Sequence, residues 1–175
     1  DMNVDRRLES IQKLGSTVTD PLVMYMFAAW KRDRVSCDGL LRMLADLESY
    51  LFRRMICSVS SNGLNKLVPS LIVRLDSAED DLAETFAALL ITETAKATRM
   101  PTDSEFRQAL LGENLYRPAW RCKYLLAGLE NYNHPKDPRS FSEYTIEHIM
   151  PQNAMAHAEW CNMLADLDRF PLLVN

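Results

Sequence analysis

A stripe of leucines between residues 37 and 57 constrains the fold of this chain more than any other feature of its sequence. Leu40, Leu44, Leu47 and Leu51 recur every three or four residues, a spacing that places them on one face of an α-helix. The opposite face is polar and carries Asp38, Arg42, Asp46, Glu48 and Ser49. Ser36 is a natural N-cap for this helix. We therefore predict an amphipathic helix at about 37–57, packed against other helices.

Apolar periodicity and helix-start signals predict three more helices in the first half of the chain. An amphipathic helix covers residues 1–14 and ends at Gly15. A second helix begins near Pro21 and is apolar almost all round as far as Trp30, which indicates burial on several sides. Residues 64–75 form a short helix, and Pro69 within it favours a kink.

Three helices are predicted between residues 77 and 131. Ser77 begins a capping arrangement with Asp80, and the helix that follows should end near Arg99. Thr102 and Glu105 form a capping box, so a short helix begins at about 103 and is interrupted at Gly112. A further helix runs from about 117 to 131, with basic residues on its polar face.

Composition describes an ordinary globular chain of 175 residues, 47% hydrophobic and 25% charged, with only five glycines. No apolar run approaches the ~20 residues that cross a bilayer, so we expect no membrane contact. The four cysteines are far apart, which excludes a zinc ribbon and fits reduced thiols in a cytoplasm. The net charge of −4 means that any contact with nucleic acid is local.

The character of the chain changes after residue 139. Residues 131–138 contain two prolines and several turn-forming residues, and they are the strongest linker signal. We predict a helical domain at 1–139 and a second domain that begins at 140. In the second domain, β-branched and aromatic residues predict a strand at 143–149, followed by a turn at 150–153 and a helix at about 156–166.

The predicted strand carries the most chemically suggestive residues of the chain. His148 lies at its end, beside the carboxylate of Glu147. A neutral imidazole in such a place can act as a general base or bind a metal ion. It can equally be a histidine whose ring nitrogens are satisfied in a small core. From the residues alone, both interpretations stay open.

A set of motifs in a fixed order resembles a known family. The motifs are Glu48–Cys57, Leu64–Lys66, Pro101–Phe106, Leu125–Glu130, Tyr144–Gln152 and Glu159–Trp160. Together they resemble the C-terminal half of GmrSD-type, modification-dependent restriction enzymes, and they are similar to Ssp-type effectors that sense phosphorothioated DNA. In that family a helical region leads into an HNH (His-Me finger) nuclease domain with a His-x-x-Pro motif, here His148 to Pro151. The resemblance covers about residues 36–160.

The resemblance implies a bacterial, cytoplasmic DNA endonuclease that defends the cell against phage. His148 would be the general base, and Glu147 would bind one divalent cation, Mg²⁺ or Mn²⁺, both of which prefer oxygen ligands. Pro151, Gln152 and Asn153 would support the site. The implied partners are modified or foreign double-stranded DNA and an N-terminal nucleotide-hydrolysing domain absent from this chain. A homo-oligomer is a further candidate assembly.

Basic residues are the candidates for holding DNA phosphates. Arg53 and Arg54 end the helix at 37–57, and Arg121 and Lys123 lie on the helix at 117–131. For Arg53 and Arg54 an alternative is open, in which the two guanidinium groups cap the helix and form ion pairs, because positive charge is favourable at a helix C-terminus.

One departure from the family pattern limits the predicted site. An HNH finger needs two strands and a helix that supplies a second metal ligand, and in the family these elements follow the position of Asn175. We therefore expect a mostly α fold, in which a multi-helix bundle precedes an incomplete, apparently truncated ββα-metal motif at 140–175. An alternative function is a helical interaction or oligomerisation module that carries a degenerate nuclease. The acidic composition and the apolar helix near Trp30 favour that alternative.

Overall fold

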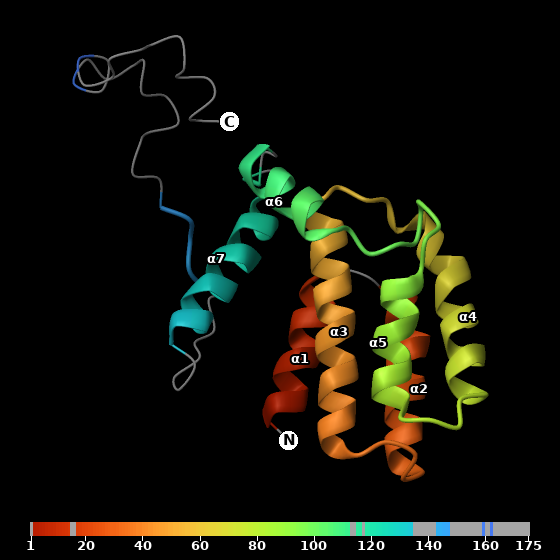
Figure 1. Cartoon of the computed structure of the whole chain (residues 1–175). Coiled ribbons are helices and arrows are strands. Elements are labelled where there is room, and N and C mark those ends of the chain that lie inside the picture. The colour runs from red at the N-terminus through yellow and green to blue at the C-terminus, as the bar shows by residue number, and fades with distance from the viewer. Residues whose placement is uncertain are drawn as a thin grey trace. The chain divides into compact units, whose positions relative to one another are not determined.

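The computed structural model describes residues 2–14, 17–112, 115–116, 118–134, 143–147, 159 and 162. The chain divides into two compact units, Asp1–Glu113 and Asn114–Asn175. This division falls before the predicted domain boundary at 139/140, which stays a prediction. Figure 1 shows that regular structure in the described residues is helical throughout, so the prediction of a mostly α fold is confirmed.

Within the described residues, six bounded α-helices lie in the first unit and one lies in the second. Their bounds are α1 Met2–Lys13, α2 Asp20–Lys31, α3 Cys37–Ile56, α4 Leu64–Asp76, α5 Leu82–Thr92, α6 Asp103–Gly112 and α7 Ala119–Asn133. Two short 3-10 helices, η1 Thr17–Thr19 and η2 Ser61–Gly63, precede α2 and α4. Each predicted helix up to residue 131 is therefore present.

Helix α3 is the centre of the first unit, where it packs against α1, α2, α5 and α6. Its leucine stripe is the core, since Leu40, Leu44 and Leu47 are at most 1% exposed. The Ser36 hydroxyl oxygen accepts a hydrogen bond from the Gly39 amide at 3.0 Å, which confirms the predicted N-cap. A Cβ at Gly39 would lie 2.5 Å from Cγ2 of Val35, so this first turn has no room for a side chain.

Helix α5 differs from the prediction at both ends. Its N-cap is Asp81, whose carboxylate accepts from the amides of Ala83 and Glu84, both at 2.9 Å. The Ser77 hydroxyl instead donates to the carbonyl of Arg74 at the end of α4, so the Ser77–Asp80 capping prediction was wrong. The helix ends at Thr92 and not near Arg99.

The early end of α5 follows from Glu93. Its backbone is extended, and its side chain turns back to accept from the amide of Ala95 at 3.0 Å and from the hydroxyl of Thr98 at 2.9 Å. These bonds stabilise a turn in place of another helical turn, because side chains that bond nearby backbone compete with helix formation. Residues 93–102 therefore form an irregular segment, named here the α5–α6 connection.

The predicted strand at 143–149 is not observed in its described part. Residues 143–147 form no strand, and Glu143 lies in a turn. A strand is stable only when its backbone groups pair with a neighbouring strand, and the residues that the structure describes include none. Of the helix predicted at 156–166, the described residues Glu159 and Asn162 are helical. The ββα motif is thus not seen in the described part of the chain.

Within the described ranges, no helix is both long and apolar enough to cross a bilayer.

Candidate functional site

The last turn of α3 holds the α5–α6 connection through a buried guanidinium group. Arg54 is 3% exposed and donates to the backbone carbonyls of Ser60 at 2.6 Å, Ala97 at 2.9 Å and Arg99 at 3.3 Å. These bonds replace the water that a buried charge loses. In this structure Arg54 is thus bound to backbone carbonyls, and its DNA contact stays a prediction. Its partners lie outside α3, so its role differs from the helix cap and ion pair of the alternative.

Tyr50 binds the same connection one turn earlier on α3. Its ring lies 5.2 Å from the guanidinium carbon of Arg54, and its hydroxyl donates to the carbonyl of Thr98. The side chain is 1% exposed, and burial raises the pKa of Tyr50 to about 12, against the opposing effect of Arg54. The phenol thus remains a hydrogen-bond donor at neutral pH. Nothing in the sequence marked Tyr50, next to Leu51 of the stripe, as a hydrogen-bond donor, so this function was missed.

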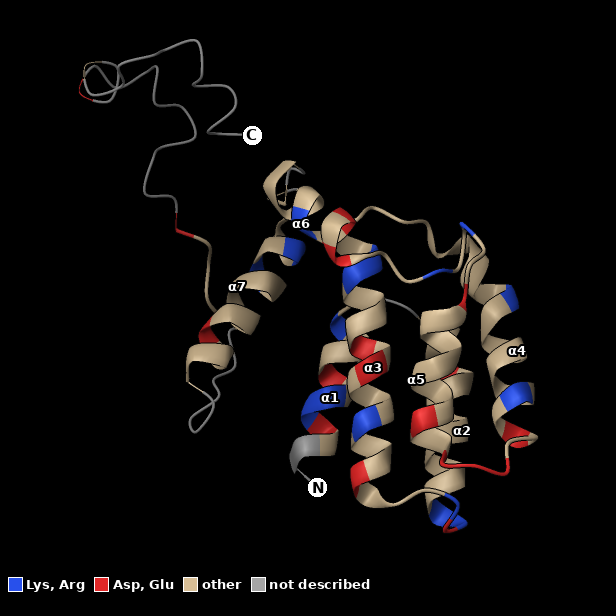
Figure 2. Cartoon of the chain, viewed as in Figure 1, with Lys and Arg blue, Asp and Glu red and all other residues tan. Residues whose placement is uncertain are grey.

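Arg53 joins the end of α3 to the start of α6. Its guanidinium donates to the carbonyl of Pro101 at 3.2 Å and pairs with the Asp103 carboxylate at 2.6 Å. It also lies 5.3 Å from the ring centroid of Phe106, while Phe52 meets the same ring edge-on at 5.6 Å. In Figure 2 the end of α3 carries basic residues, in blue, and the start of α6, which follows in contact with it, carries acidic residues, in red. As predicted in the structural alternative, Arg53 forms an ion pair.

The predicted capping box at the start of α6 is present. The Thr102 amide donates to Glu105 at 2.9 Å, and the Glu105 amide donates to the Thr102 hydroxyl oxygen at 3.3 Å. Arg99 donates to both carboxylate oxygens of Glu105. Hydrogen bonds from Arg99 and then from Thr102 lower the pKa of Glu105 to about 2. Glu105 is thus a carboxylate throughout the physiological range.

A groove of about 610 Å³ lies between this network and the loop after α3. Its lining includes Ser58, Lys96, Arg99, Glu105 and Gln108. The charge of Arg99 is balanced by Glu105, which leaves Lys96 as the uncompensated charge of the lining. The lining is of mixed polarity and carries one net positive charge.

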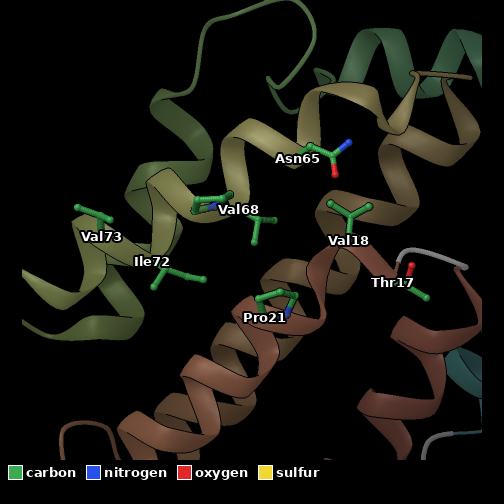
Figure 3. A pocket seen from close by; sticks show the side chains of 8 residues that line it. Thr17, Val18, Pro21, Asn65, Val68, Ile72 and Val73 are labelled. Carbon is green, nitrogen blue, oxygen red and sulfur yellow. The ribbon is translucent and has the colours of Figure 1, made fainter.

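A second groove, of about 470 Å³, is apolar and lies between α4 and the segment that leads into α2. Figure 3 shows Val68, Ile72 and Val73 of α4 on one side and Val18 and Pro21 on the other. Asn65 lies at its polar end, and the carbonyl of Asn65 lacks its usual helical donor because Pro69 has no N–H. Its lining has no titratable side chain and is suited to apolar contact.

Comparison with known families assigns the C-terminal part of the chain. Residues 100–168 match the family model of the C-terminal domain of GmrSD restriction endonucleases. This match covers less than half of the chain. The resemblance to the C-terminal part of GmrSD-type enzymes is thereby confirmed. The chain matches no curated protein and no solved structure. Residues 100–168 are named the GmrSD segment below.

The predicted catalytic residues all lie within the GmrSD segment. Glu147 is described and exposed to solvent. His148, Pro151, Gln152 and Asn153 lie outside the described residues. In the ranges that the structure describes, no three His, Cys, Asp or Glu side chains gather as a metal-binding group. The geometry of the proposed base and metal ligand is therefore not part of the described structure.

Helix α7 of the GmrSD segment carries the remaining predicted DNA contacts. Arg121 and Lys123 are both partly exposed. Two residues along an α-helix correspond to a rotation of about 200°, so these side chains leave α7 in nearly opposite directions. They do not form a common basic patch on this helix. A phosphate bound by one would not be bound by the other.

Proposed function

We propose that this chain is part of a metal-dependent DNA endonuclease of bacterial, modification-dependent restriction, which acts against phage in the cytoplasm. The observation that carries the proposal is the GmrSD match at 100–168 with His148-Ile-Met-Pro151 inside it. The substrate is double-stranded DNA, modified or foreign. Recognition of the modification belongs to an N-terminal nucleotide-hydrolysing domain that acts with this chain.

The proposed reaction is hydrolysis of a phosphodiester bond of the HNH type. The imidazole of His148 accepts a proton from water, and the resulting hydroxide attacks phosphorus while the bond to the 3′ or 5′ oxygen breaks. Near pH 7 a neutral imidazole does this without an extreme shift of its pKa. One product then ends in a phosphate, and the other ends in a hydroxyl whose oxygen has taken up a proton.

One divalent cation, held in part by Glu147, is the proposed cofactor. The carboxylate of Glu147 is an oxygen ligand of the kind that Mg²⁺ and Mn²⁺ prefer, and its exposure leaves it accessible to a hydrated ion. The cation would neutralise charge on the phosphate and stabilise the leaving oxygen. Arg121 and Lys123 would each contact the DNA backbone separately.

The test is nicking of supercoiled plasmid by the native protein that carries this chain, in Mg²⁺ and in Mn²⁺. His148→Ala should abolish nicking on modified plasmid. His134→Ala is the matched control, because this exposed imidazole is bound to Glu130 on α7 and is not assigned to the reaction. Equal nicking by His148→Ala and by the native protein would refute the assignment of the base.

A second candidate is a helical interaction module that assembles with another copy of the chain. The apolar groove between α2 and α4 favours it, together with Val73, which lines the groove and is 68% exposed. Sedimentation of the chain and of Val73→Lys separates the two functions. Concentration-dependent dimers that Val73→Lys abolishes support the module, and a strict monomer at high concentration contradicts it.

A further inference from the structure

The contacts at the end of α3 fall on the first residues of the GmrSD segment. Arg53 binds the carbonyl of Pro101, the carboxylate of Asp103 and the ring face of Phe106. The matched segment begins at residue 100. Helix α6 therefore belongs to the GmrSD segment by sequence and to the helical bundle, Asp1–Glu113, by packing.

We propose that α6 anchors the GmrSD segment on the bundle, with Phe52 and Arg53 as the positioning residues that receive it, and that this anchor sets the rate of DNA cleavage. The rate-setting part rests on the proposed nuclease function. The anchor itself rests on the geometry between α3 and α6.

Apart from the Thr102–Glu105–Arg99 network at its start, helix α6 depends on this contact for its packing. It is ten residues long, none of its side chains is buried, and Leu111 is 85% exposed. A helix of this length is marginal in water unless tertiary packing stabilises it. Phe106 supplies the apolar part of that packing against Phe52, and Asp103 supplies the charged part against Arg53.

An arginine suits the three contacts at position 53. Its planar guanidinium has donors for a carbonyl and a carboxylate in one plane, while its face lies against an aromatic ring. A lysine ammonium cannot meet all three partners in this way. The side chain of Arg53 is 25% exposed, so this contact is partly shielded from water.

The chain that leads into α6 is held in place as well. Arg54 and Tyr50 bind three carbonyls of the α5–α6 connection from one side. From another side, η2 approaches so closely that a Cβ at Gly63 would lie 2.5 Å from the Ala97 carbonyl oxygen. The start of α6 is therefore positioned by α3 and η2 together.

Charge reversal at Arg53 tests the anchor. Arg53→Glu places a like charge opposite Asp103 and removes the ring contact. The exchange rate of the α6 amides should therefore rise about tenfold, which corresponds to the stability that one ion pair and one cation–π contact contribute. Exchange in α1, α2 and α4 should stay unchanged. Arg107→Glu is the matched control, because it makes the same charge change on an exposed position of α6.

Plasmid nicking by the native protein tests the functional part. Arg53→Glu should lower the nicking rate about tenfold without weakening DNA binding, and the Arg53→Glu/Asp103→Arg double variant should restore part of the rate. Native nicking rates in Arg53→Glu would overturn the rate-setting part. Unchanged α6 exchange in Arg53→Glu would overturn the anchor. If the native protein and His148→Ala are equally unable to nick, the proposed function fails, while the exchange experiment still decides on the anchor.

Discussion

The guanidinium of Arg54 lies 5.2 Å from the ring centroid of Tyr50, and both side chains donate hydrogen bonds to carbonyls of the same connection between α5 and α6. A buried cation and a buried phenol thus provide the donors that an irregular segment cannot find within itself. This arrangement holds the connection through which the chain leaves the helical bundle's α5 and enters α6.

Removal of the buried guanidinium should strongly destabilise the chain. Arg54→Gln loses charge-assisted bonds and leaves carbonyls of Ser60, Ala97 and Arg99 without donors, so we expect a loss of about 2–4 kcal/mol in the free energy of unfolding. Urea unfolding followed by circular dichroism measures it. Arg74→Gln, at an exposed position of α4, should change that free energy by less than about 0.5 kcal/mol. Equal stability of the two variants would contradict the structural role of Arg54.

A methyl group at residue 63 should not be tolerated. In Gly63→Ala the new Cβ would come within 2.5 Å of the Ala97 carbonyl oxygen, and backbone has to move. We expect a loss of about 1–3 kcal/mol. Gly128→Ala is the control, because its Cβ meets nothing within 4 Å, and alanine in a helix should gain about 0.5–1 kcal/mol. Thermal unfolding of both variants should show shifts of opposite sign.

The phenol of Tyr50 should report its burial at alkaline pH. Because its pKa is raised to about 12, the folded state retains a proton that the unfolded state loses near pH 10. Its contribution to stability is complete below pH 10 and disappears as the pH rises to about 12. Tyr50→Phe should lose about 1 kcal/mol at neutral pH and show a smaller decline of stability over this alkaline window. Identical declines in the two proteins would place the phenol in water.

Glu105 should make the stability of the start of α6 sensitive to acid. Its pKa is lowered to about 2, so its contribution to stability is present above its ordinary pKa of about 4.5 and disappears as the pH falls to about 2. The protection factors of the α6 amides, corrected for the intrinsic pH dependence of exchange, should therefore fall over that window in the native chain. Glu105→Gln should already exchange fast at pH 6 and show little change on acidification. A native α6 that keeps its protection down to pH 2 would contradict the capping network.

Helix positions followed from the sequence because their signals are local. The leucine stripe, the Ser36 cap and the Thr102–Glu105 box each act within one or two turns, and each is present in the structure. The strand prediction at 143–149 failed in its described part, since β-propensity alone does not supply a neighbouring strand. The family of residues 100–168 was also readable from ordered motifs. The place of His148 was not decided, because it lies outside the described residues.

What the sequence determined by itself was where most of the helices begin, which faces they bury and which family model the C-terminal part matches. The tertiary structure decided which contacts the polar residues at the end of α3 make. Arg53 and Arg54 are adjacent in the sequence, yet Arg54 is buried on carbonyls more than forty residues away while Arg53 pairs with α6. The physical reason is that a charged side chain takes its role from the donors and acceptors that the fold brings to it, and those partners leave no trace in the spacing of neighbouring residues.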